Sequence, residues 1–512
     1  MNATTANGRP KPSLTANATW AFVWSVWLLL LAADLWAVGT TSRNVPIGED
    51  WFVVSAFTGN QPNFSSWLWS QNNEHRVPLP RLIMVAVLRL THGELRSVQV
   101  LNILLIAAVA AAFIRKAVSL RDGRYAFADA VFPLVALHFG HSENMLWAWQ
   151  ITFVSSFVLI SIILLQMVGK TGLRSPRAAL IGGGALVLLP LTGATGLLFV
   201  PLLNCWFIVL GLMQTRRGGD ERRAGFILLS SGALTLLVSL IYFVGYEVPP
   251  LVATRLPFAK AVWSAALVAS FGFGPAARVL DVVTVPLAVL LMIGTSALLI
   301  QRLRTSHGRD RQNTVGLAVF FAASAGYLLA LGYTRGSTAI FAFHLWPLRY
   351  ALMAAPMMYC CQFIWNLGGK RAERVGLGVV TVALLVLVPF NTVEGRIWSN
   401  WFREGADKLL ADIHRGVTPS ELAAAHRGFI PTWLDRAEPV RYLQMLKNAG
   451  VKPYHQLRAE PARVVESLNT KALSPSADWV WVDFTYSAAG ATEAALLWGV
   501  DGWQNLPKEV RP

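Results

Sequence analysis

The chain has 512 residues, of which 54% are hydrophobic and 14% are charged. This composition excludes an ordinary water-soluble domain, in which roughly 25% of the residues carry a charge. The formal net charge is +16, and in a soluble protein such an excess would suggest nucleic acid as a partner. The basic residues instead fall into short clusters between apolar runs, so we expect a lipid bilayer as the partner and no nucleic acid.

Apolar runs close to the length that crosses a bilayer, about 20 residues, recur along the chain. The basic clusters fall into alternate loops, as the positive-inside rule produces on the cytoplasmic side. We therefore predict an all-α polytopic membrane protein with about eleven transmembrane helices, a cytoplasmic N-terminus and an extracytoplasmic C-terminus. The predicted spans are 20–40, 96–114, 125–140, 147–168, 178–192, 196–213, 225–246, 279–301, 314–333, 347–367 and 375–391.

The apolar segment 77–90 does not fit as a further crossing, because counting it would invert every later loop. Its prolines and arginines favour a helix lying at the outer interface. The transmembrane domain, 1–391, therefore contains an outer loop, 41–93, with interfacial helices. The remaining residues, 392–512, have a helical pattern near 440–448 and a strand pattern at 479–484, and they predict a small α/β extracytoplasmic domain.

Two adjacent carboxylates, Glu49 and Asp50, open the first outer loop. A carboxylate there can act as a general base or as a metal ligand. The alternative is a pair of solvated loop charges. The apolar residues that follow, 51–54, predict that the pair begins a half-buried helix, where leaving a charge costs free energy, and this favours a functional role.

A second polar segment, just before the interfacial helix, contains Glu74, His75 and Arg76. Arg76 can bind a phosphate and His75 can transfer a proton. The alternative is that arginines at an interface only extend toward lipid headgroups. We predict a functional role for the three residues together.

A short outer turn between two apolar spans contains His141, Glu143 and Asn144. Polar side chains gathered beside a membrane usually face a cavity. A divalent metal, Mg or Mn, would be ligated here by His141 and Glu143 together with Asp50. A lone His-x-Glu pattern is a weak metal signal, so the use of a metal stays open.

Two further arginines, Arg335 and Arg349, lie at the outer ends of later spans. The guanidinium group offers a fixed fork of donors that matches phosphate oxygens. Arginines that only anchor a membrane protein belong on the cytoplasmic side. We therefore predict that these two residues bind phosphate, together with Arg76.

The order of these features resembles the GT-C superfamily of integral-membrane glycosyltransferases, which includes protein O-mannosyltransferases and aminoarabinose transferases. The resemblance covers about the first 400 residues. Its most specific points are the acidic pair at 49–50, the segment 73–76 before the interfacial helix, and Glu143 and Asn144 followed by Trp147 and Gln150.

The resemblance implies that a sugar passes, with inversion, from a polyprenyl-phosphate donor to a hydroxyl group of a glycan, lipid or protein acceptor. The reaction would take place at the extracytoplasmic face of a bacterial cytoplasmic (inner) membrane. Asp50 would be the catalytic base with Glu49 as its alternate, and Glu143 would be the second acidic loop residue. The chain has no Asp-x-Asp pair, which leaves metal dependence open. The implied supporting residues are Glu74, His75, His141 and Asn144.

The main alternative is a polytopic transporter or lipid-linked glycan flippase without catalysis. Such a protein places its polar groups in the middle of the membrane, whereas the predicted spans here are poor in charge. An O-antigen polymerase or ligase is a second alternative, but it typically has one very large outer loop between late spans. The apolar stretch 262–273 is expected to help form a groove for the polyprenyl tail.

Overall fold

The structure is a computed structural model that describes residues 14–169, 171–248, 256–342, 344, 346–368, 371–427, 429–430, 437–460, 465–472 and 480–486. The chain divides into two compact units, Met1–Leu457 and Arg458–Pro512. Within the described part of the second unit, strands β3 (Val465–Ala472) and β4 (Val480–Tyr486) form an antiparallel pair. Strand β4 covers the strand that the sequence predicts at 479–484.

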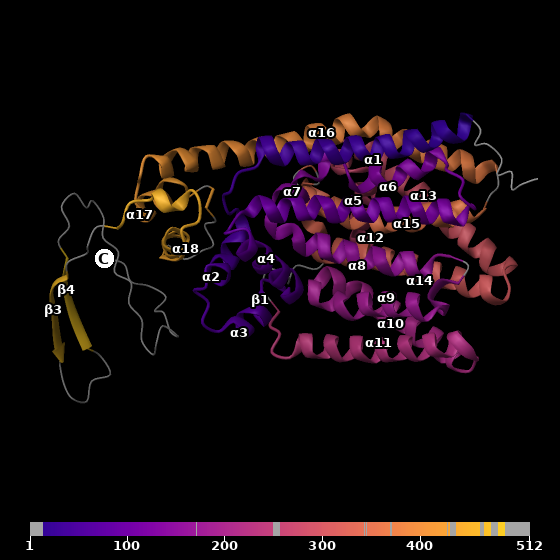
Figure 1. The fold of residues 1–512 in the computed structure, drawn as a ribbon, viewed down its shortest axis with the longest axis horizontal. Coiled ribbons are helices and arrows are strands. Elements are labelled where there is room, and N and C mark those ends of the chain that lie inside the picture. Colours follow the sequence, from indigo (N-terminus) through magenta and orange to yellow (C-terminus); the bar gives the residue numbers. More distant parts are fainter. Residues whose placement is uncertain are drawn as a thin grey trace, which may run out of the picture. The chain divides into compact units, whose positions relative to one another are not determined.

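The first unit is a bundle of long apolar helices with shorter helices between them (Figure 1). Within the described residues, eight helices are long and apolar enough to cross a bilayer, which supports the predicted polytopic all-α membrane fold. They lie in α1 (Leu14–Thr41), α5 (Leu95–Leu120), α8 (Ile151–Met167), α10 (Ala194–Thr215), α11 (Gly219–Phe243), α13 (Asp281–Thr305), α14 (Gly308–Ala342) and α16 (Arg371–His414).

The other three predicted spans are not among these eight helices. Residues 125–140 do not form one continuous helix, because a six-residue helix, α6 (Val131–Ala136), lies between 3-10 turns η2 (Phe127–Ala130) and η3 (Phe139–His141). All residues of α6 are buried, so their apolar character reflects packing inside the bundle. The predicted spans 178–192 and 347–367 correspond to α9 (Pro176–Leu188) with η6 (Leu189–Thr192), and to α15 (Ala351–Gly368).

The loop between α1 and α5 is built from short elements. These are η1 (Gly48–Val53), α2 (Val54–Phe57), α3 (Phe64–Trp69), the hairpin of β1 (Gln71–Asn72) and β2 (His75–Arg76), and α4 (Pro78–Leu90). Helix α4 confirms a helix at 77–90. Arg81 of this helix is buried and donates to the carbonyl oxygens of Trp67 (2.6 Å) and Ser70 (2.8 Å), so it holds α3 in place.

Helix α16 has 44 residues, which corresponds to about 66 Å at 1.5 Å per residue. The hydrocarbon core of a bilayer is about 30 Å thick, so much of α16 extends beyond it. The domain boundary predicted at residue 391 falls inside this continuous helix, and the division into compact units lies after Leu457. The helices that follow α16 are α17 (Pro419–Ala425), α18 (Ala437–Asn448) and η12 (Tyr454–Gln456). Helix α18 covers the helix predicted near 440–448.

The end of α16 and the helices after it share a hydrophobic core with the first loop. This second core combines Trp51 and Val54 from the loop with Phe402, Leu443 and other residues of 402–457. Polar contacts add to it, because the Asn44 side chain donates to the Lys452 carbonyl oxygen at 2.9 Å. The segment that carries Glu49 is therefore fixed from the C-terminal side of the bundle.

The short elements that complete the first unit are α7 (Ser142–Leu146), η4 (Ala148–Gln150), η5 (Gly172–Arg174), α12 (Phe258–Ser270), η8 (Phe271–Phe273), η9 (Pro275–Arg278) and η11 (Leu348–Tyr350). Three of them bring distant parts of the chain to the cavity described next. The turns η1 and η4 contact each other, and η11 packs on α7.

Candidate functional site

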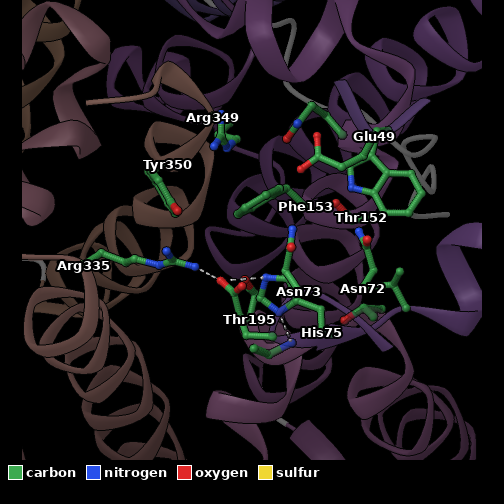
Figure 2. A pocket seen from close by; sticks show the side chains of 17 residues that line it. Glu49, Asn72, Asn73, His75, Thr152, Phe153, Thr195, Arg335, Arg349 and Tyr350 are labelled. Atoms are coloured by element: carbon green, nitrogen blue, oxygen red, sulfur yellow. Dashed lines mark hydrogen bonds and ion pairs between the residues drawn. The ribbon is translucent and has the colours of Figure 1, made fainter. Parts of the chain in front are cut away.

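A cavity of about 260 Å³ in the first unit gathers side chains from six parts of the chain (Figure 2). Arg335, Arg349 and Tyr350 reach it from one side, and Glu49 and Asn73 lie opposite them. The cavity is bounded by η1, the β1–β2 hairpin, the start of α8, the start of α10, α14 and η11. Its lining residues are Glu49, Asn72, Asn73, Glu74, His75, Val77, Trp149, Gln150, Thr152, Phe153, Thr192, Gly193, Ala194, Thr195, Arg335, Arg349 and Tyr350.

Glu49 presents a carboxylate to this cavity. Its Oε2 atom is buried and has no hydrogen-bond partner among the described residues. Burial raises the pKa of the Glu49 carboxyl, and the positive charge of Arg349 partly opposes this shift. A carboxyl with a raised pKa and a free oxygen is suited to accept a proton near neutral pH.

Asp50 has a different role in the structure. Its side chain is buried, and its two carboxylate oxygens accept hydrogen bonds from the backbone N–H groups of Ile47 (3.1 Å) and Trp149 (2.7 Å). The carboxylate therefore caps the start of η1 and ties η1 to η4. Asp50 does not line the cavity, so its geometry fits a structural role better than the base role predicted for it.

Glu143, which is buried, and Arg349, which is half-buried, form an ion pair at the edge of the cavity. Glu143 also accepts a hydrogen bond from the backbone N–H of Arg349 at 3.0 Å. Asn144 donates to the Arg349 carbonyl oxygen at 3.0 Å, and the guanidinium lies 5.6 Å from the ring centre of Trp147. The outer turn predicted from the sequence thus serves to hold Arg349 in one orientation.

We expect Glu143→Gln to destabilise the protein by about 1–3 kcal/mol, because it leaves the half-buried Arg349 charge without its partner. Arg349→Gln alone should lower the free energy of unfolding by a similar amount, because it leaves the buried Glu143 carboxylate without its partner. The double variant should cost clearly less than the sum of the two, and thermal unfolding of the purified full chain measures all three. Additive effects would contradict a direct ion pair.

Glu74, His75 and Arg335 form a second group of polar side chains at the cavity. Arg335 of α14 is ion-paired with Glu74 of the hairpin, and the Nε2 atom of His75 lies 3.4 Å from Glu74 Oε1. The backbone N–H of Ala194 donates to His75 Nδ1 at 3.4 Å, so the neutral ring carries its hydrogen on Nε2, facing Glu74. Burial lowers the pKa of His75 to about 4, which keeps the ring neutral at ordinary pH.

Arg76 does not join the other two arginines. Its guanidinium donates to the carbonyl oxygens of Trp69 (2.8 Å), Val244 (3.0 Å) and Gly245 (2.7 Å). These contacts tie the hairpin to the end of α11. Arg76 is buried and does not line the cavity, so the structure gives it a scaffold role in place of the predicted phosphate contact.

Two of the three residues predicted to ligate a divalent metal, Asp50 and Glu143, have their carboxylates engaged by other protein groups, so metal dependence stays a prediction. Asp50 is engaged by two backbone N–H groups, Glu143 is engaged by Arg349, and His141 Nε2 lies 2.9 Å from the Val135 carbonyl oxygen. Within the described part of the chain, no three His, Cys, Asp or Glu side chains gather as a metal site. The proposed chemistry below therefore contains no step through a metal.

Several lining residues could not be singled out from the sequence. Phe153 and Tyr350 meet edge to face with ring centres 5.8 Å apart, and Asn72, Thr152 and Thr195 add neutral hydrogen-bonding groups. Aromatic faces and neutral amide or hydroxyl groups suit a ligand that has both apolar and hydroxyl-rich surfaces. Among these five residues, the sequence drew attention only to Tyr350, because it directly follows Arg349, a predicted phosphate ligand.

Comparison with protein-family models and with curated proteins gives no match for this chain.

Proposed function

We propose that this chain is a membrane glycosyltransferase that moves a sugar from a polyprenyl-phosphate donor to a hydroxyl group of a cell-envelope acceptor, with inversion. The observation that carries the proposal is one cavity lined by two arginines and by Glu49, whose Oε2 atom has no hydrogen-bond partner among the described residues. The resemblance to the GT-C superfamily in the order of elements supports the same assignment. We place the reaction at the extracytoplasmic face of a bacterial inner membrane, as the charge pattern of the loops favours.

In this proposal Glu49 is the base. It accepts the proton of the acceptor hydroxyl while the oxygen forms a bond to the anomeric carbon of the sugar. The bond between that carbon and the phosphate oxygen breaks, and the polyprenyl phosphate leaves with the electron pair. Arg335 stabilises the charge on the leaving phosphate. Arg349, held by Glu143, acts on Glu49 electrostatically, so we assign it a positioning role.

The apolar part of the donor would lie against α12. This helix packs along α14, which carries Arg335, and the Leu256 backbone N–H donates to the Tyr333 carbonyl oxygen at 3.3 Å. Phe258, Val262 and Trp263 of α12 expose apolar side chains. A polyprenyl chain that follows these residues would bring its phosphate toward Arg335. Of the stretch 262–273 predicted to form the groove, Val262 and Trp263 are exposed, whereas residues 267–273 are buried.

The test is a transfer assay with the purified full chain in lipid vesicles. We use a panel of synthetic polyprenyl-phosphate-linked hexoses and pentoses, and we measure the release of polyprenyl phosphate in the presence of envelope glycan acceptors. The wild-type chain is expected to release it. Arg335→Gln is expected to slow the release by about 10²- to 10³-fold, because a charge that develops in the transition state loses its partner.

Vesicles also separate the proposed enzyme from a flippase. A flippase would move the sugar-linked lipid across the bilayer and leave its sugar–phosphate bond intact. Transbilayer movement without cleavage of any donor in the panel would contradict the proposal. Equal release by wild-type and Arg335→Gln chains would contradict the role of Arg335 while leaving the activity in place.

A further inference from the structure

Two Glu–Arg ion pairs meet at the cavity, and they differ in how they are held. The pair of Glu143 and Arg349 is built into the protein. Only 4% of the Glu143 side chain is exposed, and both of its carboxylate oxygens bind Arg349, one at the guanidinium and one at the backbone N–H. Asn144 and Trp147 add further contacts to Arg349. No ligand can displace Glu143 without breaking this set of contacts.

The pair of Glu74 and Arg335 is more open. The Arg335 side chain is 37% exposed and the Glu74 side chain is 20% exposed. Glu74 lies on a hairpin whose two strands have two residues each, and the turn places Asn73 at a positive φ of 50°. A carboxylate on such a short hairpin can change its side-chain rotamer without disturbing the packed helices.

The charges of the cavity set a constraint on any anionic ligand. Its two lining arginines are both ion-paired, while Glu49 adds a carboxylate with a free oxygen. His75 stays neutral and offers no positive charge. A phosphate group that entered beside these groups would meet no unpaired cation among the described lining residues, so it has to replace one of the two carboxylates.

We propose that Glu74 occupies the anion position of Arg335 when the cavity is empty, and that the phosphate group of the ligand displaces it. This inference deepens the proposed function, on which it rests for the identity of the anion. The displaced carboxylate has a second partner within reach, because His75 Nε2 lies 3.4 Å from Glu74 Oε1. The ring is held for this contact by the Ala194 N–H, which donates to Nδ1.

The exchange keeps every charged group partnered. Before the ligand enters, Glu74 holds the guanidinium of Arg335 in the cavity, where an unpaired arginine would turn toward solvent. Afterwards the phosphate pairs with Arg335, and Glu74 accepts a hydrogen bond from His75. Glu74 is thus a positioning residue that competes with the ligand, in contrast to Glu143, which does not compete.

The inference is tested by anion binding to the full chain in detergent micelles, measured by titration calorimetry with decyl phosphate as the probe. Glu74→Gln keeps the shape of the side chain and removes its charge. It is expected to lower the Kd for decyl phosphate about three- to tenfold, because the ligand no longer displaces a charged competitor. Arg335→Gln is expected to raise the Kd at least tenfold.

Asp407→Asn is the matched control, since it removes one carboxylate charge from the exposed ion pair of Arg43 and Asp407, whose residues do not line the cavity. It is expected to leave the Kd unchanged. An unchanged or higher Kd for Glu74→Gln would overturn the inference, as would wild-type affinity in Arg335→Gln or the absence of binding to all four chains. Inorganic phosphate as a second probe shows whether the site takes a free anion or needs the alkyl chain.

The transfer assay distinguishes this inference from the proposed function. Tighter anion binding in Glu74→Gln without sugar transfer by any chain would support the exchange and contradict the glycosyltransferase assignment. Sugar transfer by the wild-type chain with unchanged anion affinity in Glu74→Gln would support the glycosyltransferase assignment and contradict the exchange.

Discussion

Glu49→Gln is expected to lower the rate of sugar transfer by about 10²- to 10⁴-fold, the usual contribution of a general base. Glutamine fills the same space but cannot accept the proton of the acceptor hydroxyl. The donor should still bind, because the charged contact to its phosphate comes from Arg335. The measurement is the steady-state rate of polyprenyl phosphate release, with decyl phosphate affinity as the check that the cavity is intact.

Asp50→Asn is the matched control for this prediction, because the two carboxylates are adjacent in the sequence. Asp50 accepts two backbone hydrogen bonds in the protein interior, and an amide can replace only one of them. We expect a loss of about 1–3 kcal/mol in the free energy of unfolding. The folded fraction should keep most of its activity. A complete loss of activity in stable Asp50→Asn protein, with normal rates in Glu49→Gln, would assign the base to Asp50.

Gly48→Ala is expected to destabilise the protein by about 3 kcal/mol and to reduce activity with it. Gly48 has a positive φ of 51°, and a Cβ atom there would overlap the ring of Trp147. That ring is fixed because its Nε1 donates to the Ile47 carbonyl oxygen at 2.9 Å. The substitution would therefore shift η1 and the Glu49 carboxylate that follows it. Thermal unfolding and the transfer assay measure the two effects.

Gly59→Ala is the control that separates the cost of the unfavourable backbone conformation from the cost of the steric overlap with Trp147. Gly59 lies in the same loop with φ of 80°, but a Cβ atom there has nothing within 4 Å. We expect a loss of about 1 kcal/mol from the conformation alone. If Gly48→Ala and Gly59→Ala cost the same, the contact with Trp147 adds nothing and the proposed link from Gly48 to the site is wrong.

The acidic pair at 49–50 shows what the sequence could predict about the site and what it could not. Two adjacent carboxylates before an apolar run indicate a half-buried functional segment, and the structure places both at the cavity wall or just behind it. Successive residues of a 3-10 helix point about 120° apart. One of the two therefore faces the cavity and the other faces the interior, and composition alone does not say which.

His75 and Arg76 follow the same logic in a strand. Successive side chains of a strand point to opposite sides, so the hairpin that turns His75 toward the cavity turns Arg76 away from it.

Glu143 and Arg349 were predicted separately, as a loop acid and a phosphate ligand. Their pairing joins positions 206 residues apart, and no local pattern reports such a contact.

The fold was predictable where helix length and apolar composition coincide, as in the eight helices long enough to cross a bilayer. It was less predictable where apolar residues face protein instead of lipid. Residues 131–136 and 402–427 are examples, because the first form a buried short helix and the second continue α16 into another hydrophobic core. Hydropathy measures the transfer of a side chain out of water, and it does not distinguish a protein interior from lipid.

The uninterrupted course of α16 links the apolar bundle to the segment that carries Glu49. One helix contributes to the bundle and to the second core, and the second core includes the segment next to Glu49. The distance from the apolar bundle to the carboxylate is then set by the rise per residue, about 1.5 Å. In the proposed reaction the donor phosphate would lie at the headgroup level of the bilayer. The length of α16 would then act as a spacer that holds Glu49 at the depth of that phosphate.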